Sequence, residues 1–226
     1  MELLKITPQL LAMGIPQVEN IIDKLPNHPS KVYPQRSMES VDTFILHHTA
    51  SEAPLLNQAK FHVYSRNWAR IGYSVMIVDG SRIVQTNPLD VEAVHCAGWN
   101  HRSLGVCVLG DLSKRLLTNR ERELLLAVFV SLNAMYPGRQ IKGHNECKPT
   151  SCPVISTQKI REEVATLELK LALEGTANDQ LANAVKVRAR VEDIYKVAAD
   201  PAHKYNAEGL RKMNRIHDIL IAEGIL

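Results

Sequence analysis

The chain has 226 residues, of which 45% are hydrophobic and 23% are charged, and its formal net charge is +3. That length is enough for one ordinary hydrophobic core together with a small second module. The nearly balanced charge excludes the strongly basic composition typical of nucleic-acid-binding proteins, so no nucleic-acid partner is expected. No run approaches the roughly 20 apolar residues of a membrane span, so membrane insertion is not expected either.

The first residues, MELLKITPQLLAMGIP, lack the basic start, apolar core and small-residue cleavage site of a signal peptide. The expectation is therefore synthesis in the cytoplasm. Residues 1–37 are polar and rich in proline, which favours a lead-in segment that wraps the domain. One short helix is expected within it, near residues 17–24.

The segments that follow alternate between strand and helix patterns. VDTFILHH, residues 41–48, is an apolar run that predicts a strand, and residues 53–66 have nearly helical apolar spacing. Two β-rich runs flank Asp79 and Gly80, a pair that predicts a hairpin with a type I′ turn. SLGVCVLGD, residues 103–111, predicts another buried strand.

Thr118 and Glu121 have the spacing of a capping box, which predicts the start of a helix. A short strand is expected at residues 139–142, and a further helix over residues 156–175. The alternation of strands and helices indicates an α/β domain over residues 38–172.

Residues 176–226 form the last predicted part of the chain. Amphipathic patterns predict helices at 178–199 and 206–224, separated by Pro201. We expect a small α-helical module that packs against the domain or mediates self-association, because amphipathic stripes are usually buried.

The segment GHNECKPTSCP, residues 143–153, contains one histidine and two cysteines. A catalytic zinc site uses three protein ligands and leaves one position open. His144 and Cys152 stand eight residues apart across a loop with prolines, which can point both side chains inward. The third ligand is expected from His47 or His48, of which only one can reach the site, because adjacent strand residues point to opposite faces.

Three other interpretations of this segment remain open. A disulfide between Cys147 and Cys152 is sterically feasible, although the lack of a secretory signal disfavours it. Cys147 would complete a structural zinc site as a fourth ligand, but the spacing fits zinc fingers poorly. A nucleophilic Cys152 would need a histidine base, and no familiar cysteine-protease signature surrounds it.

Four ordered motifs resemble the type 2 N-acetylmuramoyl-L-alanine amidases, which include phage lysozymes of the T7 type and peptidoglycan recognition proteins. The motifs are ILHHTA, IGYSVMIVDGSRIVQ, AVHCAGWNHRSLGVCVLGD and GHNECKPTSCP, over about residues 38–160. The resemblance implies a mixed central β-sheet flanked by helices, zinc as the cofactor and peptidoglycan muropeptides as the partner. It implies hydrolysis of the amide between N-acetylmuramic acid and L-alanine, by a phage or prophage endolysin that acts on the cell wall after release. For the helical module of residues 176–226, it makes targeting of the cell wall the alternative role.

The resemblance also assigns roles to individual residues. It makes His47, His144 and Cys152 the three zinc ligands. Tyr73 matches the family tyrosine beside the zinc, and Thr150 matches a position held by lysine in T7-type enzymes and by threonine in many recognition-protein amidases. Both are expected to act in catalysis as hydrogen-bond donors, although a threonine carries no charge.

His95 and Asn100 lie in a segment that resembles the family's H-A-G-x-x-N groove motif, which implies contact with the substrate. The chain departs from the family at Ser74, where histidine is common, and His48 and His62 are expected to be structural. Two alternative functions stay open at this stage. One is a non-catalytic peptidoglycan-binding module, a class that generally lacks the cysteine ligand, and the other is a polymerase-regulating relative of the phage lysozymes.

Overall fold

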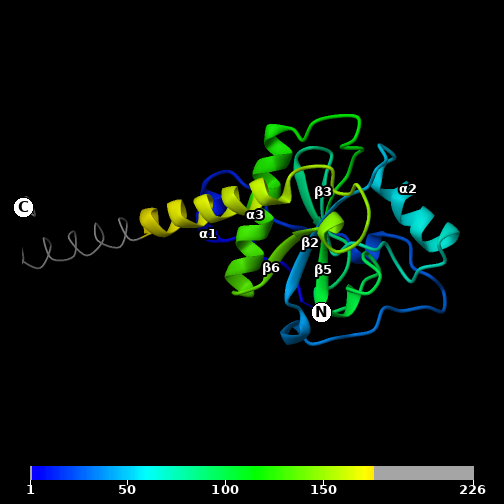
Figure 1. Cartoon of the computed structure of the whole chain (residues 1–226). Helices are drawn as coiled ribbons and strands as arrows, with labels where there is room; N and C mark the ends of the chain where they lie inside the picture. The colour runs from blue at the N-terminus through cyan, green and yellow to red at the C-terminus, as the bar shows by residue number, and fades with distance from the viewer. Residues whose placement is uncertain (1, 176–226) are drawn as a thin grey trace, which may run out of the picture. The chain divides into compact units, whose positions relative to one another are not determined.

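A six-stranded sheet forms the centre of the protein, with the strand order β1-β4-β3-β5-β2-β6 (Figure 1). The computed structural model describes residues 2–175, of which those up to Glu168 form one compact unit. The predicted C-terminal module, residues 176–226, lies outside the described residues. Within the described part of the chain, no helix is long and apolar enough to cross a membrane.

The strands of the sheet are short and mostly parallel. Only β3 and β4 pair antiparallel, as a hairpin, and the other neighbouring strands run parallel. The carboxyl ends of β2, β5 and β6 therefore meet at one edge of the sheet. The strands are β1 (Glu19–Asn20), β2 (Thr43–His48), β3 (Val75–Val78), β4 (Arg82–Gln85), β5 (Ser103–Val108) and β6 (Gln140–Gly143).

Helices flank the sheet, with α2 and α3 on opposite sides of it (Figure 1). This mixed sheet with flanking helices confirms the predicted fold class. The helices are α1 (Pro8–Ala12), α2 (Leu55–Lys60), α3 (Asn119–Met135) and a helix over residues 157–175. Shorter helical turns are η1 (Ile22–Lys24), η2 (Met38–Ser40), η3 (Phe61–Ser65), η4 (Asn100–Arg102) and η5 (His144–Glu146).

Several local predictions are confirmed. In the β3–β4 hairpin, Asp79 and Gly80 both have positive φ angles, 53° and 64°, as a type I′ turn requires. The capping box opens α3, since Glu121 N–H donates to Thr118 Oγ1 at 3.1 Å and Thr118 N–H donates to Glu121 Oε2 at 2.9 Å. The strands predicted at residues 41–48, 103–111 and 139–142 are present as β2, β5 and β6.

Two predicted helices differ in the structure. The helix near residues 17–24 is wrong, because β1 and η1 occupy that segment. Ile21 and Ile22 are adjacent and both buried, and the Ile21 N–H donates to Gln85 at the end of β4 at 3.1 Å. The helix predicted at 53–66 begins as α2 and continues as the π-helix η3. The wider turn of a π-helix is seen in the bond from the Arg66 N–H to the carbonyl oxygen of Phe61, five residues earlier.

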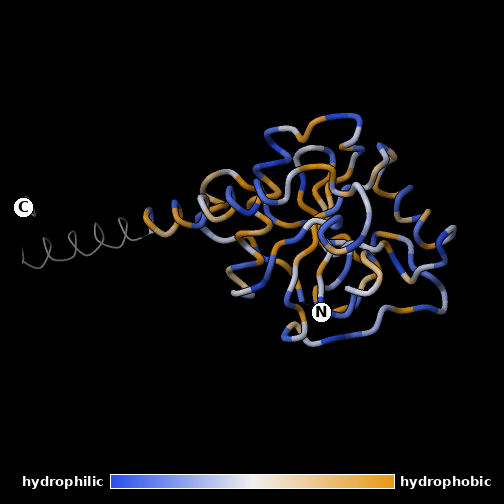
Figure 2. Tube along the Cα trace, viewed as in Figure 1, coloured by the Kyte–Doolittle hydropathy of each residue, from blue (hydrophilic) through white to orange (hydrophobic). Residues whose placement is uncertain are grey.

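The pairing of the strands decides which side chains share a face. Met76, Cys107 and His47 stand in register across β3, β5 and β2, so their side chains point to the same face of the sheet. The hydrophobic cluster on that face includes Ala59 of α2. Figure 2 shows hydrophobic segments running through the interior and hydrophilic segments around them.

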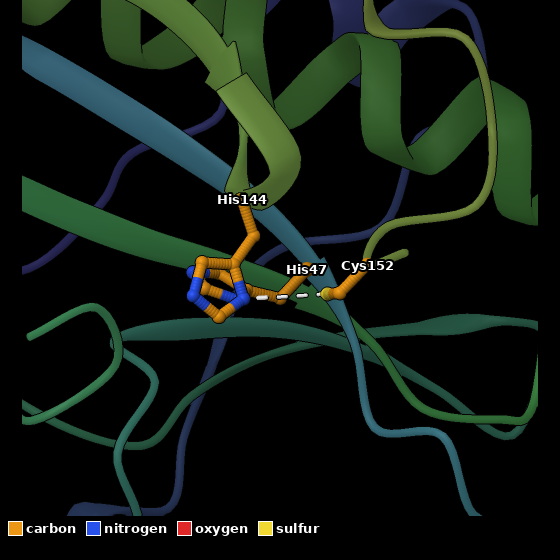
Figure 3. Close-up of side chains that lie close together, drawn as sticks. All are labelled: His47, His144 and Cys152. Carbon is orange, nitrogen blue, oxygen red and sulfur yellow. Dashed lines mark hydrogen bonds between the residues drawn. The ribbon is translucent and has the colours of Figure 1, made fainter. Parts of the chain in front are cut away.

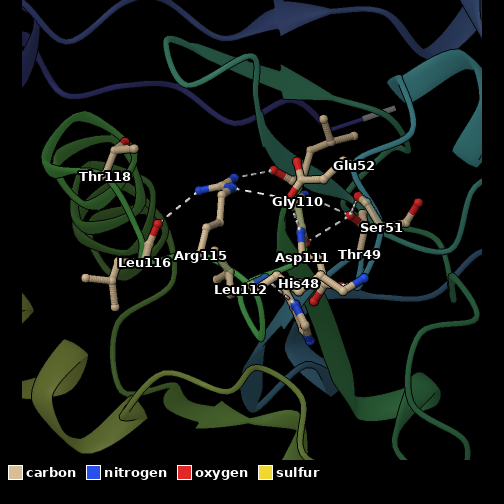
Figure 4. Close-up of polar contacts among 12 residues, drawn as sticks. His48, Thr49, Ser51, Glu52, Gly110, Asp111, Leu112, Arg115, Leu116 and Thr118 are labelled. Carbon is tan, nitrogen blue, oxygen red and sulfur yellow. Dashed lines mark hydrogen bonds and ion pairs between the residues drawn. The ribbon is translucent and has the colours of Figure 1, made fainter.

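A polar network ties the chain that follows β2 and β5 to the start of α3 (Figure 4). At its centre, the Arg115 guanidinium donates to the two oxygens of the buried Glu121 carboxylate, each at 2.8 Å. The same guanidinium donates to the carbonyl oxygens of Leu109 and Leu116 at 3.1 and 3.2 Å, and to Glu52 Oε1 at 3.3 Å. The Arg115 side chain thus joins the segment after β2, the segment after β5 and the first turn of α3.

Gly110 allows this network to form. Its φ is +139°, and a Cβ at this position would collide with the Arg115 guanidinium. The Gly110 N–H donates to Thr49 Oγ1 at 2.8 Å, and Thr49 directly follows His48 at the end of β2. The network therefore fixes the backbone next to the predicted zinc ligand.

We expect Arg115→Met to lower the free energy of unfolding by about 3 kcal/mol, because it leaves the buried Glu121 carboxylate without its charged partner. Arg120→Met is a matched control in the first turn of α3, since the ion pair of Arg120 with Glu123 is exposed and its loss should cost less than about 1 kcal/mol. Urea denaturation at pH 7 measures both changes. Equal losses in the two variants would contradict the central role of Arg115.

Candidate metal centre

Three side chains from two distant segments converge at the carboxyl end of β2 (Figure 3). His47 comes from β2, His144 from η5 and Cys152 from the loop that follows, and their ligand atoms all lie within 4.8 Å of one another. Because Leu46 pairs with Gly143 in the parallel β2–β6 ladder, the next residue of each segment, His47 and His144, stand side by side. The centroids of their rings are 4.5 Å apart.

The donor set fits a tetrahedral metal such as zinc. Cys152 Sγ lies 3.8 Å from His47 Nδ1. Two ligands of one tetrahedral zinc, with bonds of about 2.3 Å to sulfur and about 2.0 Å to nitrogen, stand about 3.5 Å apart. Three such donors leave a fourth position open, which is the arrangement of catalytic rather than structural zinc sites.

The loop that carries Cys152 is closed by internal hydrogen bonds. Asn145 N–H donates to the Cys152 oxygen at 2.7 Å, and Gly143 N–H donates to Glu146 Oε2 at 2.6 Å. Arg161 pairs with the Glu146 carboxylate at 3.0 Å. Glu146 is therefore part of the loop's framework and is not a free carboxylate beside the three ligands.

Burial keeps the two histidines neutral. It lowers the pKa of His47 well below the usual value, and the neighbouring rings of His95, His144 and His48 lower it further. The pKa of His144 is also lowered, first by burial and then by the charge of Lys148. A neutral imidazole offers a lone pair to a metal, so both histidines can bind a cation without losing a proton.

The cysteine behaves differently. Burial raises the pKa of the Cys152 thiol to about 11, although a backbone hydrogen bond with His48 opposes the shift. The thiol is therefore protonated at neutral pH, and a metal has to displace its proton. The Cys147–Cys152 disulfide considered from the sequence is not formed, and the Cys147 thiol hydrogen-bonds with that of Cys96.

The two predicted catalytic donors each lie next to one of the proposed ligands. The ring of Tyr73 is 5.3 Å from that of His47, and its hydroxyl bonds with the Cys107 thiol. Burial raises the pKa of the Tyr73 hydroxyl well above its usual value, so the phenol stays a neutral donor. Thr150 is exposed, and its Oγ1 accepts the Cys152 N–H at 3.3 Å.

His95 and Asn100, the predicted substrate contacts, border the same site. His95 is buried beside His47, with its Nδ1 3.0 Å from His47 Nε2 and its Nε2 3.2 Å from Ser103 Oγ. Asn100 Oδ1 accepts the backbone N–H groups of His95 and Cys96 at 3.1 and 2.8 Å. That both residues contact a substrate stays a prediction.

The remaining histidines near the site hold backbone groups. His48 Nδ1 accepts the Leu112 N–H at 3.1 Å, and the pleat of β2 turns this ring to the face opposite to His47. His62 Nδ1 accepts the Gly72 N–H at 3.1 Å. These contacts agree with the structural roles expected for His48 and His62.

Two residues against His95 lie within a quoted motif, but the sequence assigned them no role. Ser103 bonds its ring, and Gly105 provides space for it, since a Cβ there would lie 2.8 Å from His95 Cγ. The available signal was Gly105 itself, because a glycine inside a strand often marks a close approach of another part of the protein.

A profile of the N-acetylmuramoyl-L-alanine amidase family matches residues 37–154. The chain is 29% identical to peptidoglycan-recognition protein SC2 of Drosophila simulans over 121 residues, which are 48% of this chain and 66% of that protein. The match thus leaves out about a third of that relative's length. The chain is 27% identical to the endolysin of Escherichia phage T7 over 128 residues, 52% of this chain and 83% of the endolysin.

Solved structures agree on the fold. The Ph2119 endolysin from the Thermus scotoductus MAT2119 bacteriophage Ph2119 superposes with a TM-score of 0.57 at 25% identity, over 66% of this chain and 99% of the endolysin. The N-acetylmuramoyl-L-alanine amidase LysCS from Clostridium intestinale gives a TM-score of 0.55 at 21% identity, over 67% of this chain and 97% of the amidase.

We expect zinc binding to release close to one proton per ion near pH 7. The Cys152 thiol, with its pKa of about 11, must bind as the thiolate, whereas the two histidines are already neutral. Zinc affinity should therefore rise about tenfold per pH unit between pH 7 and pH 9. Calorimetry in buffers of different ionisation enthalpy counts the protons, and Cys147→Ser should leave the count unchanged. Zinc binding without proton release would exclude Cys152 as a ligand.

Proposed function

Because the chain belongs to the N-acetylmuramoyl-L-alanine amidase family, we propose that it is a zinc-dependent enzyme that hydrolyses the amide between N-acetylmuramic acid and L-alanine in peptidoglycan. The observation that carries this proposal is the convergence of His47, His144 and Cys152 within the region that matches the family. His47 is buried while His144 and Cys152 are partly exposed, so a substrate can approach from the side of the last two.

In this proposal, His47, His144 and Cys152 hold the metal. When bound, zinc would activate a water molecule and polarise the scissile carbonyl. Two neutral imidazoles and one thiolate leave the centre with a net charge of about +1. That charge favours the negative charge that develops on the carbonyl oxygen as the amide is attacked.

Tyr73 is the proposed donor to that oxygen. Its phenol stays neutral and stands beside His47, and a preorganised donor of this kind contributes about 3 kcal/mol to transition-state stabilisation. Thr150 is proposed as a second donor with a smaller contribution, because its hydroxyl is exposed and uncharged. His95 and Asn100 are proposed to contact the muropeptide, and the support for this is their place in the segment that resembles the groove motif.

The endolysins among the similar proteins support a role in lysis of the cell wall. Peptidoglycan is therefore the proposed partner, reached after the protein is released from the cell that makes it. A chain of this family without hydrolytic activity would act as a peptidoglycan-binding module, and the assay below distinguishes the two functions.

The test uses purified full-length protein and isolated peptidoglycan, with new N-terminal alanine as the product measured. We expect the zinc-loaded protein to release alanine, a chelator to stop the release, and added zinc to restore it. Cys152→Ser should lose zinc and at least about 100-fold of the activity. Cys147→Ser, which changes a neighbouring thiol of the same loop, should retain both. Binding of muropeptides by zinc-loaded protein without release of alanine would favour the binding module.

We expect Tyr73→Phe to lower kcat about 100-fold with unchanged zinc content, because it removes one hydrogen-bond donor and no ligand. Tyr64→Phe is the matched control, since that tyrosine is 67% exposed on η3. Steady-state rates on a soluble muropeptide, with zinc measured by atomic absorption, provide both quantities. A Tyr73→Phe variant with full zinc and the rate of the unchanged protein would remove Tyr73 from the mechanism.

A further inference from the structure

The ring of His95 lies between the proposed ligand His47 and the start of β5. Its Nδ1 is 3.0 Å from His47 Nε2, and the two rings meet edge to face, with centroids 5.1 Å apart and an interplanar angle of 88°. Its Nε2 is 3.3 Å from the Ser103 carbonyl oxygen and 3.2 Å from Ser103 Oγ. Both histidines are buried, so each ring nitrogen in these contacts depends on its protein partner.

These contacts decide which nitrogen of each ring carries the proton. A carbonyl oxygen only accepts, so the contact with the Ser103 oxygen requires a proton on His95 Nε2. The Ser103 hydroxyl does not supply that proton, because it donates to the Trp99 carbonyl oxygen at 2.7 Å. A neutral imidazole has a single N–H, so His95 Nδ1 is an acceptor, and His47 Nε2 must be the donor in their bond.

The lone pair of His47 is then on Nδ1, the nitrogen that lies 3.8 Å from Cys152 Sγ. We infer that His95 is a positioning residue, which accepts the Nε2 proton of His47 and thereby fixes the tautomer and the ring orientation in which Nδ1 binds the metal. The inference rests on the proposed zinc site, and it gives His95 a role that requires no contact with substrate.

The sheet is shaped to admit the His95 ring at this level. Gly105 and Cys107 lie on the same face of β5, and Cys107 is in register with His47. Because Gly105 has no side chain, the His95 ring can pack directly on the strand, where a Cβ would lie 2.8 Å from its Cγ. The Asn100 side chain fixes the backbone of His95 through the bond to its N–H at 3.1 Å.

The choice of a histidine as the partner has a chemical consequence. A histidine that binds a metal usually donates its second N–H to a carboxylate, a carbonyl oxygen or water. Here the acceptor is a neutral ring whose own proton goes to the Ser103 carbonyl oxygen. The chain of bonds from Ser103 through His95 to His47 thus sets the orientation of the ligand without placing a negative charge in the buried site.

Two substitutions of nearly the same shape test this role. Asparagine at position 95 keeps an acceptor close to the place of Nδ1, and leucine has none. We expect His95→Leu to bind Zn²⁺ about 10- to 100-fold more weakly than the unchanged protein, and His95→Asn to stay within about fivefold. Competition with a chromophoric chelator measures both affinities without any assay of activity, and the absorption spectrum of the Co²⁺-loaded protein reports the ligand geometry.

Both variants lose the packing of the ring, and urea denaturation of the metal-free proteins measures that loss. If the role of His95 is only to fill space, the leucine and asparagine variants bind zinc equally, and the inference is overturned. The inference is supported if the asparagine variant binds zinc more tightly than the leucine variant, whichever of the two is more stable without metal.

Nitrogen-15 NMR of the unchanged, metal-free protein gives a test that does not depend on any variant. We expect His47 and His95 each to carry their proton on Nε2. A proton on His47 Nδ1 would overturn the inference whether or not the protein hydrolyses peptidoglycan. If the expected tautomers are present but the protein binds no zinc and releases no alanine, the proposed function fails and the assignment of the His95 bond stands.

Discussion

The site depends on the register of β2 between its two parallel neighbours, β5 and β6. Pairing of Leu46 with Gly143 brings His47 and His144 side by side at one edge of the sheet, although they are far apart in the sequence. Pairing of His47 with Cys107 turns the ligand to the face that Ala59 of α2 covers. A slip of one residue would bring His48 to that face instead, because the side chains of a strand alternate. The Arg115 network holds the backbone directly beyond β2 and so protects this register.

The three proposed ligands share an electrostatic property that follows from their burial. Each donor is neutral before a metal arrives, because burial lowers the pKa of His47 and His144 and raises that of Cys152. Neutral groups lose less solvation energy on burial than ions do, so the folded protein can keep the set assembled without a buried charge. The only proton that must leave on metal binding is that of the thiol. The acceptor behind His47 is a neutral imidazole as well, so the same principle extends to the His95 bond.

The parts of this structure that could be predicted from the sequence are those with local causes. The Asp79-Gly80 hairpin and the capping box of α3 depend on residues within a few positions of one another. Spacing alone left His47 and His48 as equal candidates, and the ordered motifs that resemble the family singled out the first. The two-residue strand β1 could not be predicted, because only its long-range pairing with β4 defines it. The contact of His95 with His47 could not be predicted either, because it depends on the long-range packing of the His95 ring against Gly105 of β5.

The His95–Asn100 segment links the predicted groove to the proposed metal ligand His47. Asn100 fixes the backbone of His95 through the peptide N–H, and the His95 ring accepts the proton of His47. A change in this segment therefore acts on the ligand as well as on any substrate that lies against the groove. Reduced hydrolysis by a variant in this segment does not by itself identify a substrate contact, because a misplaced His47 has the same effect on the rate. Zinc affinity separates the two causes. Loss of a substrate contact leaves the zinc affinity unchanged, whereas loss of the His95 acceptor lowers it.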